Sequence, residues 1–347
     1  MNSRKLTSES VEDMSKPLVS VVITCKNSLD TIRETLESLR NQTFQDFEVI
    51  VIDAFSDDGT FGYLSAKKTE WEKLHVQREQ GNPAKGRNSG ILRARGDYIA
   101  FIDADAYAHP DWLETLVKAI RQYENDGILG VGGPGEIPPA DPINAKVIGS
   151  VLSSPLVGLN TRNNARWKTV RHVDHHPFFN AIYRRDIFEK VGLLNERLDV
   201  GEDVEFGWRV RKAGFKLLYI PNAIVYHHRR KSIASLAKQM YRYGYWRMIL
   251  RLVDGSLISP IHFAPLGLLV IVVLTIVSSL MAPFFNFLTH VFTSLSLTYV
   301  LLMISLAMSI AIKFRSPKVF LLAFTSAIVT HICYGLGSLK GLFEKRI

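Results

Sequence analysis

The sequence predicts an α/β fold with a mainly parallel sheet covered by helices, followed by an amphipathic helix and a carboxyl-terminal group of transmembrane helices. Two observations predict it. Strand-like and helix-like segments alternate between residues 17 and 228, which is the pattern of a parallel sheet covered on both faces. Beyond residue 255 the 347-residue chain is mostly apolar, in uncharged stretches long enough to cross a bilayer.

The expected elements of the domain at 17–228 follow in order along the chain. A β-branched run at 18–24 predicts the first strand, and residues 31–39 carry apolar side chains at helical spacing. The other expected strands are 47–52, 74–77, 97–102 and 223–226. The other expected helices are 84–93, 111–123 and 204–213, and residues 56–60 have the composition of a turn.

The region 256–347 is expected to hold two or three transmembrane spans. No Asp, Glu, Lys or Arg occurs between residues 256 and 312 or between 319 and 339. Because a bilayer core needs about 20 apolar residues per helix, spans are expected near 264–284, 289–312 and 318–338. Gly335, Gly337 and Gly341 could break the third segment and make it re-entrant, which leaves its topology open.

Charge placement predicts an integral membrane protein, with the plasma membrane as the leading candidate, and a cytoplasmic soluble domain. The tail at 1–16 is polar and lacks the apolar core of a signal peptide. Lys313, Arg315 and Lys318 form a basic loop between the second and third spans, which the positive-inside rule also places in the cytoplasm. The basic end of the chain disagrees, because three complete spans would put it on the other side.

A basic amphipathic helix is expected at 229–255, just before the first span. Residues 227–251 contain seven Lys or Arg and no acid, interleaved with aromatic and aliphatic residues. This pattern predicts a helix in the membrane interface that meets anionic lipid head groups, with Arg242 and Trp246 as candidate acceptor contacts. An ordinary anchor without a substrate role is the alternative. The net charge of +9 would also suit nucleic acid, but the apolar segments that follow favour lipid, so no nucleic-acid partner is expected.

Two carboxylates follow the expected strand at 97–102. Asp103 and Asp105 stand one residue apart at its end, and the carboxyl edge of an open α/β sheet is where such folds bind ligands. Carboxylate oxygens suit Mg²⁺ or Mn²⁺. By itself the Asp-Ala-Asp triplet is also compatible with a solvated turn.

Five motifs in order resemble glycosyltransferase family 2, the inverting transferases of GT-A fold that use nucleotide-sugar donors. The motifs are Val-Ser-Val-Val-Ile-Thr-Cys-Lys-Asn at 19–27; Phe-Glu-Val-Ile-Val-Ile-Asp at 47–53 followed by Ser-Asp-Asp-Gly-Thr at 56–60; Gly-Arg-Asn-Ser-Gly at 86–90; Asp-Ala-Asp at 103–105; and Gly-Glu-Asp at 201–203 with Glu205 and Arg209. The segments 226–230 and 241–247 resemble the membrane-bound subgroup similar to succinoglycan-type transferases, which build lipid-linked saccharides.

The resemblance implies roles for the donor side of the site. Asp53 would bind the base of a UDP- or GDP-sugar, with Thr24 and Asn27 lining the same pocket, although a strand-end turn is the structural alternative. Arg87 and Asn88 would approach the ribose or the diphosphate. The sequence departs from the common family pattern at Ala54 and Phe55, and Phe55 could stack on the base or fill core.

The resemblance also implies the metal ligands. Asp103 would serve the sugar and ribose side and the metal, and Asp105 would be the closer ligand. His227 would complete the binding of a divalent ion, Mn²⁺ or Mg²⁺. The neighbouring His228 is an equal candidate by sequence.

Asp203 is the expected catalytic residue. An inverting transfer needs a carboxylate that takes the proton of the acceptor hydroxyl. Glu202 and Arg209 are candidate contacts for the acceptor or diphosphate. Asp203 could also simply compensate a helix dipole, and Arg209 could pair with Glu205 one turn away.

The expected function is the transfer of a sugar to a hydroxyl of a polyprenyl-linked saccharide. The alternative within the same class is a polyprenyl-phosphate (dolichyl-phosphate type) glycosyltransferase, which needs no general base because its phosphate acceptor is already ionised. From another class, the chain could be an inactive membrane scaffold or a sugar-binding module, which the presence of all four candidate aspartates disfavours.

Overall fold

The computed structural model describes residues 16–158 and 167–346, which form two compact units. The first, here called the sheet unit, contains residues up to Glu136 and from Trp167 to His227. The second, the helical unit, contains residues from Ile137 and from His228 onward. The segment 137–158 was expected inside the domain at 17–228. It packs instead with the carboxyl-terminal helices, because α6 (Ile143–Leu152) buries its apolar side chains among them.

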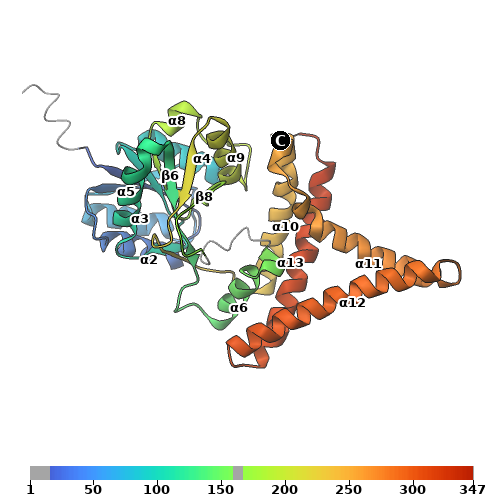
Figure 1. Ribbon diagram of the computed structural model, residues 1–347. Coiled ribbons are helices and arrows are strands. Elements are labelled where there is room, and N and C mark those ends of the chain that lie inside the picture. Colours follow the sequence, from blue (N-terminus) through green and yellow to red (C-terminus); the bar gives the residue numbers. More distant parts are fainter. Residues whose placement is uncertain (1–15, 159–166, 347) are drawn as a thin grey trace, which may run out of the picture. The chain divides into compact units, whose positions relative to one another are not determined.

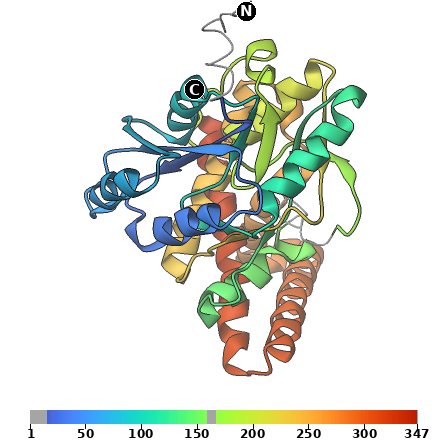
Figure 2. The same cartoon turned by 90° about the vertical axis from the view of Figure 1, so that its left-hand side faces the viewer.

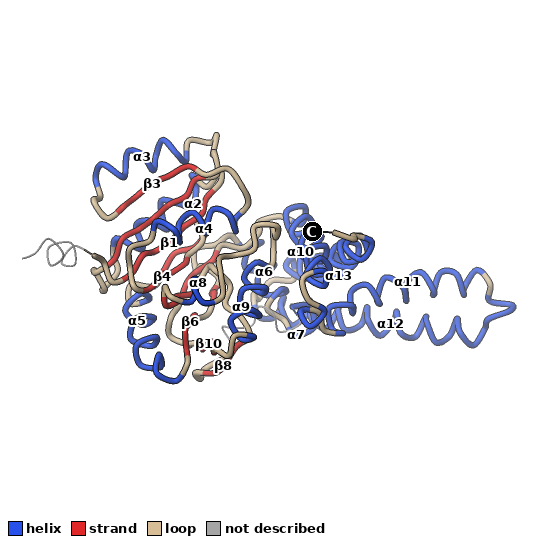
Figure 3. The backbone as a smooth tube through the Cα atoms, turned by 90° about the horizontal axis from the view of Figure 1, so that it is seen from above, coloured by secondary structure: helices blue, strands red, loops and turns tan. Residues whose placement is uncertain are grey.

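The sheet unit is built on an eight-stranded sheet in the order β3-β2-β1-β4-β9-β6-β10-β8 (Figure 3). The strands are β1 (Val19–Cys25), β2 (Phe47–Asp53), β3 (Leu74–Arg78), β4 (Tyr98–Phe101), β6 (Ile128–Gly132), β8 (Arg171–Val173), β9 (Ala181–Arg184) and β10 (Lys216–Tyr219). The first four in this order are parallel, as expected. The rest is mixed: β9 is antiparallel to β4 and β6, β8 is antiparallel to β10, and only β6 and β10 run parallel.

Alternation along the strands divides the core into two layers (Figure 2). In β1, Val21 faces one layer and Val22 the other. The first layer is covered by α2 (Leu29–Arg40), α3 (Thr60–Glu70) and α5 (Trp112–Tyr123), which is followed by a short 3₁₀ turn (Glu124–Asp126). The second is covered by α4 (Pro83–Arg93), α8 (Ile187–Lys190) and α9 (Glu202–Lys212).

The glycines of the segment 86–90 bring α4 close to β1. A Cβ on Gly86 would lie 2.9 Å from Thr24 Cγ2, and one on Gly90 would overlap Val22. These glycines therefore serve packing, and they fix the position of Arg87 and Asn88 relative to the strand.

A second sheet of three short strands lies next to the end of β4. It has the order β5-β11-β7, with β5 (Ala106–Ala108), β7 (Gly135–Glu136) and β11 (Val225–His227). The antiparallel pairing of β5 and β11 puts His227 opposite Ala106, directly beside Asp105. Strand β11 overlaps the strand expected at 223–226, whereas the short strands β5 and β7 were not predicted.

The helical unit consists of α6, α7 (Pro155–Gly158), α10 (Ile233–Ile249), α11 (Ala264–Leu280), α12 (Ala282–Lys313) and α13 (Lys318–Phe343). Short 3₁₀ turns at Leu250–Leu252, Gly255–Leu257 and Pro260–Phe263 connect α10 to α11. Three helices are long and apolar enough to span a membrane: Pro260–Leu280, Asn286–Lys313 and Lys318–Phe343. The expected spans are therefore present as helices, and α11 and α12 form a hairpin (Figure 1).

Helix α13 is continuous, so the break that Gly335, Gly337 and Gly341 could have caused does not occur. They allow a close approach to α10 instead, because a Cβ on Gly337 would overlap the carbonyl oxygen of Tyr241. Gly244 on α10 contacts the backbone of Tyr334 in the same way. This is the packing that small residues permit between apolar helices.

Helix α10 was expected to turn its apolar face toward lipid, and the structure corrects this. Leu236, Met240, Gly244 and Met248 are buried within the helical unit, where α10 packs along α13. The face that remains exposed is polar and basic, with Lys238 and Arg242 upon it.

Candidate active site

The candidate site lies at the carboxyl edge of the parallel strands. Asp53 is the last residue of β2, and Asp103 follows β4 by two residues. Strands β2, β1 and β4 are neighbours, so both acids stand at the edge where α/β sheets bind ligands.

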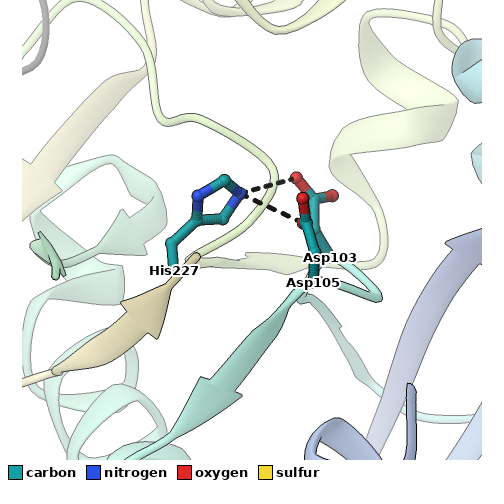
Figure 4. A group of neighbouring side chains, drawn as sticks. All are labelled: Asp103, Asp105 and His227. Carbon is teal, nitrogen blue, oxygen red and sulfur yellow. Dashed lines mark ion pairs between the residues drawn. The ribbon is translucent and has the colours of Figure 1, made fainter. Parts of the chain in front are cut away.

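Asp103, Asp105 and His227 form a cluster with the composition of a divalent-metal site. One ligand atom of each lies within 4.8 Å of the others. His227 Nε2 is 3.2 Å from Asp105 Oδ1 and 3.7 Å from Asp103 Oδ2, and the imidazole points at both carboxylates (Figure 4). Two carboxylates and one imidazole suit Mn²⁺ or Mg²⁺, with positions left for diphosphate oxygens.

Strand pairing and an aromatic contact orient His227. The pairing of β11 with β5 places it beside Asp105, and its ring lies 4.9 Å from the ring of Phe179. His228, the other candidate, belongs to the helical unit, where its Nδ1 lies 2.5 Å from the buried Asp141 carboxylate. The structure therefore brings His227, and not His228, to the two aspartates.

Arg87 links the metal cluster to the helix that carries the expected base. Its Nη2 donates to Asp103 Oδ1 at 2.9 Å and its Nη1 to Glu202 Oε1 at 2.6 Å. The guanidinium is almost entirely buried and lies over the ring of Phe178. We expected Arg87 at the ribose or diphosphate; here both ends of the guanidinium are occupied by protein carboxylates.

The two acids that flank Arg87 have shifted pKa values in opposite directions. Burial raises the pKa of Glu202 to about 7, and the nearby Asp203 carboxylate adds to the rise while Arg87 opposes it. Burial also acts to raise the pKa of Asp103, but the hydrogen bond from His227 and the charge of Arg87 outweigh it and hold that pKa below its usual range. Asp103 is thus kept ionised for a cation.

Asp203 lies at the start of α9, next to Glu202 and two residues after Gly201. Gly201 has φ of 91°, a left-handed conformation that glycine adopts without strain, and it turns the chain into the helix. Asp203 is half-buried, and its Oδ1 accepts a hydrogen bond from Val204 N at 2.8 Å. The bridge through Glu202 and Arg87 connects this carboxylate to the metal cluster.

Asp53 is completely buried, which bears on its expected contact with a base. Its carboxylate accepts hydrogen bonds from Ser56 N, at 3.2 and 3.3 Å, and from Arg78 Nε at 3.1 Å. No carboxylate oxygen of Asp53 is exposed in this structure. Its observed role is to order the loop after β2 and to hold Arg78.

Phe55 and Arg78 form an exposed surface next to Asp53. Phe55 is 52% exposed, so it does not fill core, and its φ of 56° is unusual for a residue with a side chain. The guanidinium of Arg78 lies 4.5 Å from the ring of Phe55 and 4.2 Å from that of Phe61. A flat aromatic surface beside a cation is suited to stacking against a nucleobase.

Comparisons with known proteins identify the family of this chain. The model of glycosyl transferase family 2 matches residues 20–192. Glycosyltransferase AglE of Haloferax volcanii is 30% identical over 233 residues, which are 66% of this chain and 72% of AglE. The chain belongs to glycosyltransferase family 2.

Two further similarities were found for this family 2 protein. The dolichyl N-acetyl-alpha-D-glucosaminyl phosphate 3-beta-D-2,3-diacetamido-2,3-dideoxy-beta-D-glucuronosyltransferase of Methanococcus voltae is 26% identical over 235 residues, 65% of this chain and 71% of that protein. The structure of S. aureus TarS 1-349 in complex with UDP aligns with a TM-score of 0.45 and 20% identity, over 65% of this chain and 64% of the TarS 1-349 chain.

Several residues that the family motifs singled out have structural partners in this glycosyltransferase. Asn88 exchanges hydrogen bonds with the backbone of Leu194 and donates to Glu196, which holds the loop before α9. Arg209 pairs with Glu205 through two bonds of 2.8 and 2.9 Å, the alternative weighed against a diphosphate contact. It also donates to the carbonyls that precede α9.

The remaining expected residues fall into two groups. Asn27 is exposed at the edge of the site, where its Oδ1 accepts from Asp57 N and ties the loops after β1 and β2 together. Thr24 is half-buried against α4. Arg242 and Trp246 lie on α10 of the helical unit, and Trp246 contacts the ring of Tyr245.

Sequence reasoning missed Arg78 and Phe179. Arg78 ends β3, whose neighbour β2 ends in Asp53, so its position at the carboxyl edge was the available signal. Phe179 had no comparable signal, because its contact with His227 joins residues that are distant in the chain.

Proposed function

We propose that this family 2 glycosyltransferase is a membrane-bound enzyme that moves a sugar from a nucleotide-sugar to a hydroxyl of a polyprenyl-linked saccharide. The observation that carries the proposal is the chain of contacts from Asp103 through Arg87 to Glu202, which joins a cation site to the Asp203 carboxylate. Inverting transfer needs both features: a charged site for the departing diphosphate and a base for the incoming hydroxyl.

Asp203 would accept the proton of the acceptor hydroxyl as that oxygen attacks the anomeric carbon. Asp103, Asp105 and His227 would hold a divalent cation, which supplies neutralisation of the diphosphate charge when bound. Arg87 keeps Asp103 in place and fixes the start of α9. Phe55 and Arg78 would receive the base of the nucleotide.

The half-buried carboxylate of Asp203 favours a hydroxyl acceptor over polyprenyl phosphate. An ionised phosphate would be repelled by this carboxylate, and it needs no base. The name of the Methanococcus voltae relative describes transfer to a sugar already carried on dolichyl phosphate. The exposed basic face of α10, with Lys238 and Arg242, would meet anionic head groups and acceptor phosphates.

The test is sugar transfer by the purified full-length protein in detergent with Mn²⁺. A panel of UDP- and GDP-sugars is offered with either polyprenyl phosphate or a polyprenyl-diphosphate sugar. We expect transfer to the sugar-bearing lipid, and we expect Asp203→Asn to reduce it by about 10²- to 10⁴-fold while nucleotide binding persists. The matched control is Asp174→Asn, an acid whose side chain is 80% exposed.

Transfer to bare polyprenyl phosphate that survives Asp203→Asn would replace the proposal with the phosphate-acceptor alternative. An absence of nucleotide binding by the folded protein would favour an inactive scaffold.

A further inference from the structure

The helical unit carries three helices long enough to cross a bilayer, and α13 packs along α10 as well as against α11 and α12. We propose that only the α11–α12 hairpin enters the bilayer, and that α13 stays with α10 on the side of the sheet unit, so that the carboxyl terminus lies on that side. The proposal depends on membrane association and not on the chemistry of the active site.

The carboxyl-terminal half of α13 is bound to α10. Arg251, just after α10, donates from Nη2 to the carbonyls of Leu342 at 2.5 Å and Glu344 at 2.8 Å. The Tyr245 hydroxyl donates to Glu344 at 3.3 Å, and Gly341 contacts the Tyr245 carbonyl. The carboxyl-terminal ends of α10 and α13 are therefore adjacent (Figure 1).

Helix α10 cannot lie across the bilayer. Its exposed face carries Lys238 and Arg242, whose charges are costly in hydrocarbon. It follows the last strand of the sheet unit after five residues, without an intervening span. Because α10 remains on the side of the sheet unit, the part of α13 that is paired with it remains there too.

The amino-terminal half of α13 is covered by another element that cannot cross. Helix α6 has only 10 residues, and the chain leaves the sheet unit at Ile137 and returns to it at Trp167. Its apolar face shares a core with the end of α12 and the start of α13, made of Val147, Ile148, Val151, Leu152, Met303, Ala307, Ile310, Val319, Ala323 and Ala327. Helix α6 thus covers one face of the second half of α12 and of the first half of α13, while Ile304, Met308 and Leu321 stay exposed.

One side of α13 is buried in this protein core, and Leu321, Leu336 and Phe343 remain exposed on it. In the most apolar 18-residue stretch of α13, 39% is buried inside the protein. In the corresponding stretch of α11 the buried share is 11%. Buried polar groups on α13 also have protein partners, such as His331, whose Nδ1 lies 3.0 Å from the Tyr299 hydroxyl.

The α11–α12 hairpin has the opposite character. Its helices contact each other through Thr275 and Ser296 at 2.9 Å and through Ser278 and Thr289 at 2.8 Å. The surface around these contacts is apolar and exposed, with Val270, Val273, Ile276, Leu280, Phe287, Leu288 and Leu295 upon it. The 17 residues of α11 rise about 26 Å at 1.5 Å each, close to the ~30 Å of a bilayer core.

This arrangement removes the conflict in the charge pattern. A two-span hairpin returns the chain to its starting side at Lys313, and the basic residues at Arg315 and Lys318 then lie in the cytoplasm. The basic end of the chain, with Lys340, Lys345 and Arg346, joins them there. Three complete spans would have placed that end outside.

The test is labelling of single cysteines with a membrane-impermeant maleimide in inside-out and right-side-out vesicles. The background is the full-length protein with Cys25→Ser and Cys333→Ser. The reporters are Lys68→Cys on exposed α3, Asn286→Cys at the hairpin tip, Ser316→Cys between α12 and α13, and Lys345→Cys at the end of the chain. Thermal melting of each variant in detergent, compared with that of the parent, checks that it is folded.

We expect positions 68, 316 and 345 to label from one side and position 286 from the other. Labelling of 345 together with 286 would overturn the proposal in favour of three spans. Labelling of 286 from the same side as 68 would overturn it because the hairpin would not cross, and so would recovery of the protein in the soluble fraction. The active-site proposal stands or falls separately, through sugar transfer.

Discussion

At the scale of single residues, the site depends on which side chains are held by protein and which are left for ligands. Arg87 and Asp53, both expected to touch the donor, have their polar atoms paired inside the protein. Asp103, Asp105 and His227 converge instead into a group that could hold a metal ion. Phe55 and Arg78 form the exposed surface next to Asp53.

The metal site predicts different outcomes for the two adjacent histidines. We expect His227→Asn to weaken Mn²⁺ binding by at least the 10- to 100-fold seen for losses in supporting residues, because a ligand is removed. His228→Asn should leave Mn²⁺ affinity nearly unchanged and lower thermal stability, because His228 pairs with the buried Asp141. Titration of the full-length protein with Mn²⁺, followed by electron paramagnetic resonance, measures both. Equal loss of affinity in the two variants would contradict the assignment of His227.

Glu202 predicts a pH dependence of stability. Because burial raises its pKa to about 7, the folded state holds a proton that the unfolded chain releases near pH 4.5. The contribution of Glu202 to the free energy of unfolding is fully present below pH 4.5 and is lost as the pH rises through 7. Glu202→Gln cannot ionise, so its stability relative to the parent should increase over this range, by at most roughly 3 kcal/mol.

Thermal melting of the metal-free protein at pH 5 to 8 tests this expectation. Glu70→Gln, at a position whose side chain is 51% exposed, is the control and should show no such trend. A pH profile of Glu202→Gln parallel to that of the parent would mean that Glu202 is ionised throughout.

At the scale of elements, small residues decide where helices meet. The glycines of α13 let α10 pack closely against α13, and the glycines of α4 let α4 pack closely against β1. By sequence alone the glycines of α13 could have broken that helix, because propensity describes an isolated helix and not one packed against a neighbour.

The α10–α13 contact predicts a contrast between two glycines in apolar helices. Gly337→Ala would force its Cβ into the Tyr241 carbonyl, whereas Gly267→Ala on α11 meets nothing within 4 Å. We expect Gly337→Ala to lower the melting temperature in detergent by several degrees, consistent with overpacking that costs about 1–3 kcal/mol. Gly267→Ala should be neutral or stabilising. Equal melting temperatures would mean that α10 and α13 can separate without cost.

At the scale of the whole molecule, apolar surface and basic charge make separate contributions to membrane binding. The net charge of +9 favours anionic lipid, and that attraction is screened by salt. The exposed α11–α12 surface is not sensitive to salt in this way. We expect the full-length protein to remain in the membrane pellet after 1 M salt and alkaline carbonate washes. Release by salt alone would show that electrostatic attraction is the main contact.

The sequence by itself determined the features that depend on residues close together along the chain. These are the four parallel strands, the acids at their ends, the apolar carboxyl-terminal helices and the membership of a family suggested by five ordered motifs. Alternation, helical periodicity and uncharged length are local patterns, so they can be read without knowing the fold.

Only the tertiary structure decided which distant residues meet. His227 reaches Asp103 and Asp105 because β11 pairs with β5, and Arg87 reaches Glu202 across 115 positions of the chain. Contacts between distant segments also place 137–158 with the carboxyl-terminal helices and pack α13 against α6 and α10. Such contacts depend on how whole elements pack, and local patterns do not contain that information.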